Sequence, residues 1–186
     1  MTAEEIVYHV LDALEALGVP HMVVGSFSSN LYGLPRSTRD ADFVVELRDV
    51  PVSRLAQQLG PDFRLDPQMS FETITGTYRL IASHVASAFR VEFFLLSNDP
   101  HDRARFARRR REAFPEREGF VATPEDVVVT KLRWSKGGNR QKDLDDVTNV
   151  IVGQKGQLDW EYVRRWCAAH GTTDLLERVK RDAEAE

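Results

Sequence analysis

Two acidic residues at alternate positions are the feature of this sequence most able to carry chemistry. Asp40 and Asp42 lie in the run DADF. Because side chains alternate between the faces of a β-strand, both acids would lie on one face, about 6.5–7 Å apart along the chain. Such carboxylates repel each other unless a cation lies between them, and hard oxygen ligands suit Mg²⁺. The pair indicates a metal site, although an accidental Asp-x-Asp is the plainer alternative in a chain with 15 aspartates.

A glycine and a serine lie before these acids, separated from them by thirteen residues. Gly25-Ser26 joins an expected strand, 21–24, to an expected helix, 26–32. Glycine permits close approach of the backbone, and the N–H groups at a helix N-terminus attract phosphate. Nucleotide phosphates together with Mg²⁺ held by paired carboxylates are typical of phosphoryl or nucleotidyl transfer.

Glu92 could add a third carboxylate. It lies in an apolar run whose neighbours Val91 and Phe93 would face the other side of the strand. One interpretation is an edge-strand glutamate that faces water or pairs with Arg90. The other is that this strand lies beside the first acidic strand, so that Glu92 completes one acidic cluster.

Two later helices carry a second charged pattern. On the expected helix 124–134, Lys131 lies at the margin of the apolar stripe. Its ammonium group either extends to water or faces a buried phosphate. On the expected helix 140–152, Asp143 and Asp146 share a face three residues apart, and Asp143 in the first turn could simply favour the helix dipole.

The elements that position these residues follow from periodicity, caps and turn signals. Thr2 caps the first helix, Gly18 ends it, and Pro51 opens another helix. We expect an α/β (α+β) fold, with residues 1–120 as an α/β core and residues 121–186 as a helical part packed on it. The remaining expected elements are helices over 2–17, 51–59, 100–111, 158–169 and 173–183 and strands over 40–47, 71–76, 78–84 and 89–96.

Composition narrows the class of protein further. The 186 residues include 42% hydrophobic and 29% charged residues, which suits one folded domain. The net charge of −4 argues against a general nucleic-acid binder.

The single cysteine, Cys167, excludes an intramolecular disulfide and indicates the cytoplasm. No apolar run suits a membrane, and the acidic N-terminus is no secretory signal. Six arginines within 103–111 form either a solvated helix face or a phosphate-binding patch.

These motifs together resemble the nucleotidyltransferase superfamily, which includes DNA polymerase beta and the aminoglycoside and lincosamide nucleotidyltransferases. More narrowly, the segments GLPRSTRDADFVVEL (33–47) and ATPEDVVVTKLRWSKGGNRQKDLDDVTNVI (122–151) are similar to the minimal nucleotidyltransferases of the AbiEii abortive-infection toxin type. The resemblance covers about residues 5 to 170. It implies a nucleotidyltransferase core with a mixed β-sheet flanked by helices.

The resemblance implies that Asp40, Asp42 and Glu92 bind two Mg²⁺ ions, one of which can arrive with the NTP. Glu92, where many relatives carry aspartate, would also help to deprotonate the attacking hydroxyl. Arg36 and Thr38 would contact phosphate or brace their loop, and Asp143 would point toward the nucleotide or orient a lysine. The implied nucleotide-binding residues are Gly25, Ser26, Arg36, Thr38, Lys131 and Asp143.

We therefore expect a Mg²⁺-dependent enzyme that transfers an NMP group from an NTP to an acceptor hydroxyl and releases pyrophosphate. The acceptor would be RNA such as tRNA, a protein or a small molecule, and a toxin-type member would have an antitoxin partner. One alternative is a catalytically degenerate module of the same fold that binds nucleotide or a partner. A more distant one is an Asp-x-Asp glycosyltransferase, although only 39 residues precede Asp40.

Overall fold

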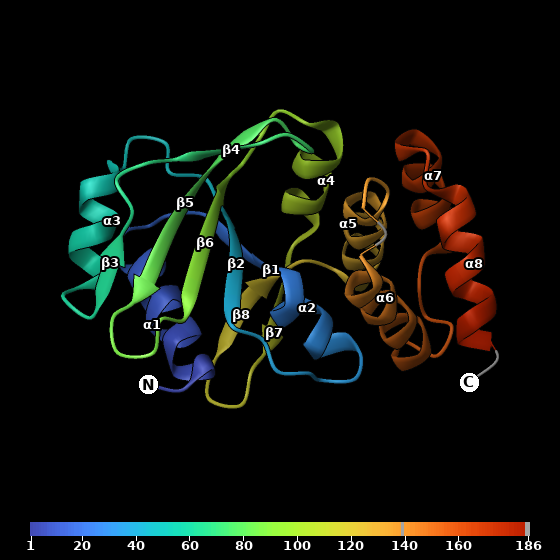
Figure 1. Ribbon diagram of the computed structural model, residues 1–186, viewed down its shortest axis with the longest axis horizontal. Coiled ribbons are helices and arrows are strands. Elements are labelled where there is room, and N and C mark those ends of the chain that lie inside the picture. The colour runs from blue at the N-terminus through green and yellow to red at the C-terminus, as the bar shows by residue number, and fades with distance from the viewer. Residues whose placement is uncertain (139, 185–186) are drawn as a thin grey trace. The chain divides into compact units, whose positions relative to one another are not determined.

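The structure is a computed structural model that describes residues 1–138 and 140–184 (Figure 1). The contacts within the chain define two compact units. The sheet unit contains residues 1–24 and 37–121, and the helical unit contains residues 25–36 and the described residues from 122 onward. Residues 25–36, which we expected in the first 120-residue part, therefore group with the C-terminal helices.

The sheet unit is a mixed β-sheet with helices. Within the described residues its eight strands run in the order β3-β5-β6-β2-β1-β8-β7, and β4 also pairs with β5. The pairs β2–β6 and β1–β8 are parallel and the others are antiparallel, which confirms the expected mixed α/β fold. The elements are α1 (Ala3–Ala16), β1 (His21–Val24), β2 (Asp40–Val45), α3 (Val52–Leu59), β3 (Phe63–Leu65), β4 (Ser70–Glu72), β5 (Thr77–His84), β6 (Arg90–Leu95), α4 (Pro100–Arg108), β7 (Arg110–Ala113) and β8 (Glu118–Val121).

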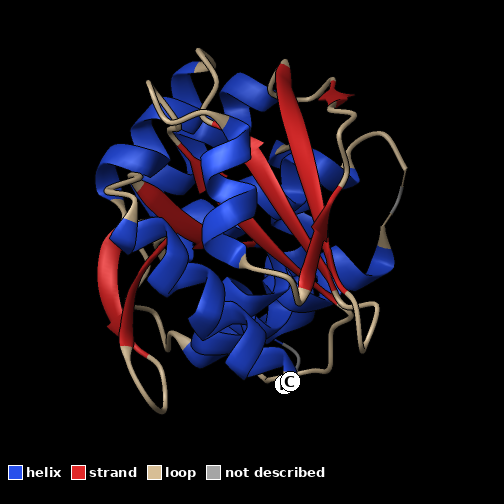
Figure 2. Cartoon of the chain, turned by 90° about the vertical axis from the view of Figure 1, so that its left-hand side faces the viewer, coloured by secondary structure: helices blue, strands red, loops and turns tan. Residues whose placement is uncertain are grey.

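One face of this sheet forms the apolar core. Alternation in β2 and β6 places Phe43 against Phe93, with ring centroids 5.8 Å apart. Helices α1 and α3 cover this face, because the ring of His9 on α1 contacts the Leu59 carbonyl at the end of α3 and stacks on Phe63 of β3. Figure 2 shows helices packed against the twisted strands. The opposite face of β2 and β6 carries the three predicted acids and, further along the strands, Val44 and Phe94.

The helical unit contains α2 (Gly25–Tyr32), α5 (Pro124–Ser135), α6 (Gln141–Gly153), α7 (Trp160–His170) and α8 (Thr173–Glu184). Helices α2 and α6 approach closely because glycine lies at their crossing. A Cβ atom on Gly153 would collide with the Tyr32 carbonyl oxygen, and one on Gly33 would lie 2.8 Å from the Asn149 carbonyl carbon. The Tyr32 hydroxyl donates to the Ala122 carbonyl just before α5 (2.9 Å). These contacts fix α2 against α5 and α6.

Several sequence-based boundaries are wrong in the middle of the chain. The expected helix 100–111 ends at Arg108, and residues 110–113 form strand β7 instead. The expected strand 71–76 ends at Glu72, because the carboxylate of Glu72 accepts the backbone N–H groups of Ile74 and Thr75 and closes a turn. Strands β3 and β8 were not expected.

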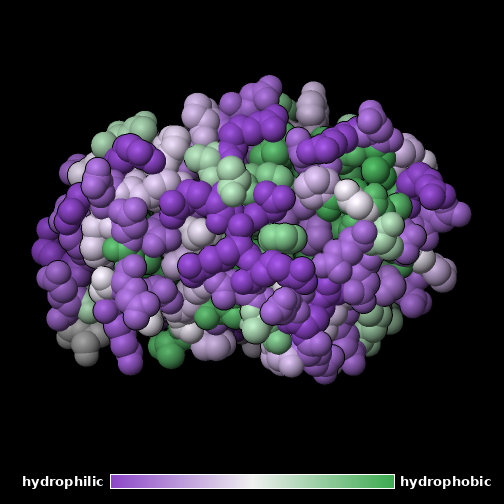
Figure 3. Space-filling view, turned by 180° about the vertical axis from the view of Figure 1, so that it is seen from behind, coloured by the Kyte–Doolittle hydropathy of each residue, from purple (hydrophilic) through white to green (hydrophobic). Residues whose placement is uncertain are grey.

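The surface is largely polar on the face shown in Figure 3, with small apolar patches between hydrophilic side chains. Within the part of the chain that the structure describes, no helix is both long and apolar enough to span a membrane.

Candidate active site

The three predicted acids lie together in the sheet unit. Strands β2 and β6 are parallel neighbours, and Asp42 lies directly opposite Glu92 in their register. Asp40 lies two residues before Asp42, so all three side chains point from the same face of the sheet, opposite to Phe43 and Phe93. Strand β6 is an inner strand between β5 and β2, and Glu92 is only 7% exposed. The interpretation of Glu92 as an edge-strand residue facing water is therefore wrong.

Each of two acids has a partner that holds its carboxylate. The hydroxyl of Thr38 donates to Asp40 Oδ1 (2.7 Å), and Arg79 Nη1 donates to Glu92 Oε2 (2.8 Å). Arg90 Nη2 lies 4.0 Å from both Asp40 Oδ2 and Glu92 Oε1. Two guanidinium groups thus offset the negative charge that three neighbouring carboxylates would otherwise concentrate on one face.

The three carboxylates suit a divalent cation, both in their chemistry and in the positions of the two strands that carry them. Three carboxylates from two adjacent strands offer the hard oxygen ligands that Mg²⁺ takes. Among the described residues, however, no group of three acidic, histidine or cysteine side chains already converges on one point. The carboxylates of Asp40 and Glu92 are instead turned toward Thr38 and Arg79. A bound cation therefore requires side-chain rotation but no change of strand pairing.

The second group of predicted residues lies in the helical unit, and Gly25 is its first residue in sequence. It is the first residue of α2, immediately after β1, and its φ of 64° is a conformation that favours glycine. Ser28 and Ser29 donate back to the carbonyls of Gly25 (2.8 Å) and Ser26 (3.1 Å). The first turn of α2 is therefore tightly organised, with the Ser26 hydroxyl at its start.

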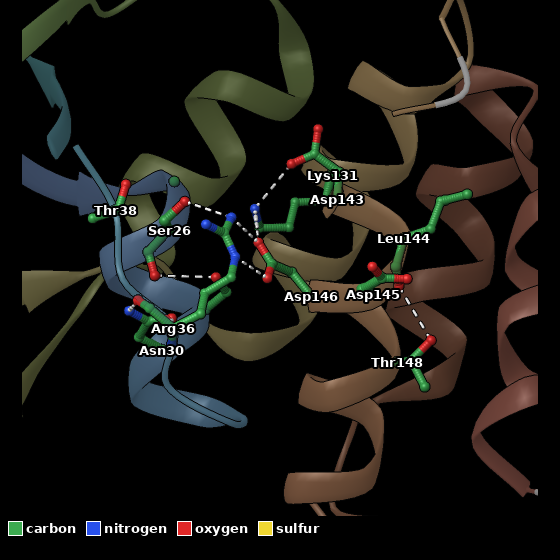
Figure 4. Close-up of polar contacts among 12 residues, drawn as sticks. Ser26, Asn30, Arg36, Thr38, Lys131, Asp143, Leu144, Asp145, Asp146 and Thr148 are labelled. Atoms are coloured by element: carbon green, nitrogen blue, oxygen red, sulfur yellow. Dashed lines mark hydrogen bonds and ion pairs between the residues drawn. The ribbon is translucent and has the colours of Figure 1, made fainter. Parts of the chain in front are cut away.

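A network of charged side chains connects this turn to α5 and α6 (Figure 4). Arg36 donates from Nε and Nη2 to the two carboxylate oxygens of Asp146 (2.7 and 2.8 Å), and Nη2 also donates to the Ser26 hydroxyl (2.9 Å). Lys131 donates to Asp146 Oδ2 (2.7 Å) and to Asp143 Oδ1 (3.1 Å). Lys131 is only 7% exposed, so its ammonium group does not extend to water.

Burial and charge act in opposite directions on Asp146. Burial by itself would raise the pKa of this carboxyl, but hydrogen bonds and charge from Arg36 and Lys131 lower the pKa below its ordinary value. Asp146 is therefore ionised. Asp143, the neighbour three residues earlier, also lies 2.9 Å from Arg140 Nε.

The structure thus brings the predicted residues together in two groups. One contains Asp40, Asp42 and Glu92, with Thr38 bracing Asp40; the other contains Ser26, Arg36, Lys131 and Asp143, next to Gly25. Two contributors were missed: Arg79, which holds Glu92, and Asp146 as the shared acceptor of Arg36 and Lys131. In the sequence, Asp146 could be noticed only because it shares a helix face with Asp143. Nothing in the sequence pointed to Arg79.

The arginine-rich segment does not form one helix face. Arg105 on α4 is buried in an ion pair with Asp102 (2.7 Å). Arg110 and Arg111 lie on β7 and pair with Glu112 (2.5 Å) and Glu118 (3.3 Å). Acidic partners therefore neutralise much of the charge that the sequence concentrates here.

The fold of this chain is similar to the fold of several solved structures. The chain matches no protein-family model and no curated protein in sequence. Solved structures establish a nucleotidyltransferase-like fold. The solution structure of the antibiotic-resistance factor ANT(2'')-Ia matches with a TM-score of 0.63 at 11% identity over 100% of both chains. A crystal structure of ANT(2'')-Ia with adenylyl-2''-tobramycin gives 0.61 at 13% identity over 91% of this chain and 97% of that one.

Two further proteins show the same fold. The lincosamide antibiotic adenylyltransferase LnuA, bound to lincomycin, matches with a TM-score of 0.54 at 12% identity over 80% of this chain and 96% of its own. A nucleotidyltransferase-like antigenic protein from Paracoccidioides brasiliensis gives 0.57 at 17% identity over 97% of this chain and 94% of its own. The expected nucleotidyltransferase fold is confirmed, whereas the narrower likeness to AbiEii-type toxins stays a prediction.

Proposed function

We propose that this protein is a Mg²⁺-dependent nucleotidyltransferase that moves an NMP group from an NTP to an acceptor hydroxyl and releases pyrophosphate. The observation that carries the proposal is the placement of Asp40, Asp42 and Glu92 on one face of two adjacent inner strands. Nothing in apolar packing explains three neighbouring carboxylates at this position. The nucleotidyltransferase-like fold supports the same class of reaction.

In the proposed reaction Asp40, Asp42 and Glu92 would hold two Mg²⁺ ions. Such ions stabilise charge on the attacking and leaving oxygens. Glu92 also accepts the proton of the acceptor hydroxyl, whose oxygen then bonds to the α-phosphorus of the NTP. The bond from that phosphorus to the oxygen bridging to the β-phosphate breaks, and pyrophosphate leaves with the bonding electrons. Thr38 keeps Asp40 oriented through its hydrogen bond.

The nucleotide itself would be bound by residues of the helical unit. Gly25 and Ser26 begin α2, where backbone N–H groups and the helix dipole favour phosphate. Arg36 and Lys131 supply positive charge, and Asp143 would orient Lys131, to which it accepts a hydrogen bond. Thr38 donates to Asp40 and Arg36 donates to Asp146, and these contacts support the proposal that both residues brace their loop.

The second candidate is a module of the same fold that binds nucleotide or a partner without catalysis. The observation in its favour is that Arg79 and Arg90 already lie against Glu92 and Asp40. A site whose acids serve only as ion-pair partners would need no metal.

The acceptor is proposed by class alone. ANT(2'')-Ia and LnuA are an antibiotic-resistance factor and a lincosamide adenylyltransferase, which favours a small-molecule hydroxyl. The segments that resemble AbiEii-type toxins favour RNA or protein, and an antitoxin partner would follow from that type. The cytoplasmic location stays a prediction.

A transfer assay tests the proposal. We would incubate the protein with each α-labelled NTP, Mg²⁺ and pools of tRNA, protein or small polyols, and follow pyrophosphate and label. We expect pyrophosphate release by the wild type and a loss of about a thousandfold or more in Asp40→Asn/Asp42→Asn. Asp49→Asn, at an exposed aspartate outside the site, is the matched control.

Equal turnover in the wild type and the double variant would contradict the proposed site. Tight NTP binding with no turnover on any pool would favour the non-catalytic module. Release of UDP from UDP-sugars would favour the glycosyltransferase alternative.

A further inference from the structure

Asp146 on α6 is a buried carboxylate that pairs with two cations, Arg36 and Lys131. It accepts two hydrogen bonds from Arg36 and one from Lys131, at 2.7–2.8 Å. It is only 2% exposed, and the paired N–H groups of Arg36 meet its two oxygens in the side-by-side geometry that fixes a guanidinium in place.

The same pairing determines where the Arg36 loop lies. The side chain of Asn30 on α2 bonds the backbone of Arg36 in both directions, donating to its carbonyl (2.7 Å) and accepting its N–H (3.1 Å). Asp146 then holds the guanidinium, and Arg36 Nη2 reaches the Ser26 hydroxyl. The first turn of α2 is thereby joined to α6 through a single carboxylate.

Asp146 also limits what Lys131 can do. Two of the three ammonium N–H donors of Lys131 go to Asp146 and Asp143. Within the described residues no partner for its third donor is found, although the side chain is more than nine-tenths buried. A buried ammonium with a donor left over is ready to bind an anion.

We propose that Asp146 is a positioning residue of the nucleotide site, which holds Arg36 beside Ser26 and fixes Lys131 so that both cations can receive the triphosphate. The proposal rests on the proposed function. Asp146 does not itself touch the nucleotide, because its negative charge would repel phosphate. It acts through the two cations, and its removal should weaken NTP binding more than it changes the chemical step.

The test compares Asp146→Asn with Asp145→Asn, which makes the same change at the exposed preceding residue of α6. The first readout needs no nucleotide: the solvent-exchange rate of the Arg36 Nε–H group, measured by NMR on the full chain. We expect exchange to quicken about tenfold or more in Asp146→Asn and to stay unchanged in Asp145→Asn. Unchanged exchange in Asp146→Asn would overturn the proposal whatever the protein's activity.

The second readout is NTP affinity in variants that circular dichroism shows to be folded. We expect Kd for Mg²⁺·NTP to rise about ten- to a hundredfold in Asp146→Asn, with a smaller change in kcat. Arg36→Lys, which keeps the charge but loses the paired geometry, should weaken binding similarly. Adding Asp146→Asn to it should then cost little more.

Wild-type affinity in Asp146→Asn, despite faster exchange, would overturn the nucleotide role. Failure of the wild type to bind any NTP would overturn the proposed function and this role with it. In that case the exchange rates would still decide whether Asp146 holds Arg36.

Discussion

His21 is a buried side chain through which the stability of the fold depends on pH. It lies in β1 and is 3% exposed, and its Nδ1 donates to the Val19 carbonyl (2.8 Å). Its Nε2 has no hydrogen-bond partner among the described residues. Burial lowers the pKa of this imidazole because a proton on Nε2 would have no acceptor there.

This predicts a pH dependence of stability. Because the folded-state pKa lies below the unfolded value of about 6.5, the unfolded chain binds more protons between the two values. The contribution of His21 is therefore fully present above about pH 6.5 and is lost as the pH falls toward the folded-state pKa. Urea unfolding across this window should show a flatter profile in His21→Phe than in the wild type. Parallel profiles would mean that His21 is not held neutral.

At the residue scale, part of the candidate site could be read from the sequence. Alternation along a strand sufficed to put Asp40 and Asp42 on one face, and an apolar context sufficed to single out Glu92. The hydrogen-bond partners of the site residues could not be predicted, because they lie far apart in the sequence: Arg36 and Asp146 are 110 residues apart. Similarly, Arg79 meets Glu92 only because β5 pairs with β6.

At the scale of elements, the helices were predictable because their caps are local. Thr2 and Glu5 form a reciprocal capping box at the start of α1, and Gly18 follows its end with a φ of 63°. Strands β7 and β8 could not be predicted from the sequence, because their segments RREA and EGFV show no apolar alternation. β7 is an edge strand whose charged residues pair with each other and with β8. Charged residues on an edge strand disfavour pairing with another chain, but they also remove the apolar pattern by which a strand is recognised in a sequence.

The crossing of α2 and α6 yields a prediction at this scale. Alanine normally stabilises a helix relative to glycine, but a Cβ atom on Gly153 would meet the Tyr32 carbonyl oxygen, a backbone atom that cannot move aside cheaply. We expect Gly153→Ala to lower the free energy of unfolding by about 1–3 kcal/mol. Chemical denaturation measures this. Gly137→Ala, where the new Cβ would meet nothing within 4 Å, is the control and should be close to neutral. Equal effects would contradict the close crossing.

At the scale of the whole molecule, the chain divides its candidate chemistry between two units. The acids that would bind metal lie in the sheet unit, and the cations that would bind phosphate lie in the helical unit. The segment 25–36 carries Gly25, Ser26 and Arg36, and it belongs to the helical unit although it follows β1 directly in sequence. A division of the chain near residue 120 alone does not capture this, because hydrophobic periodicity carries no information about which distant segments pack together.

The proposed function requires that the protein binds an NTP together with Mg²⁺ and that the acids of the sheet unit are needed for this binding. Calorimetric titration of ATP, GTP, CTP and UTP, with and without Mg²⁺, tests it most directly on the full chain. The wild type should bind at least one NTP in a Mg²⁺-dependent way, Asp42→Asn should weaken that binding by about a hundredfold, and Asp49→Asn should leave it unchanged. Metal-independent binding that is equally tight in all three proteins, or no binding of any NTP, would contradict the claim.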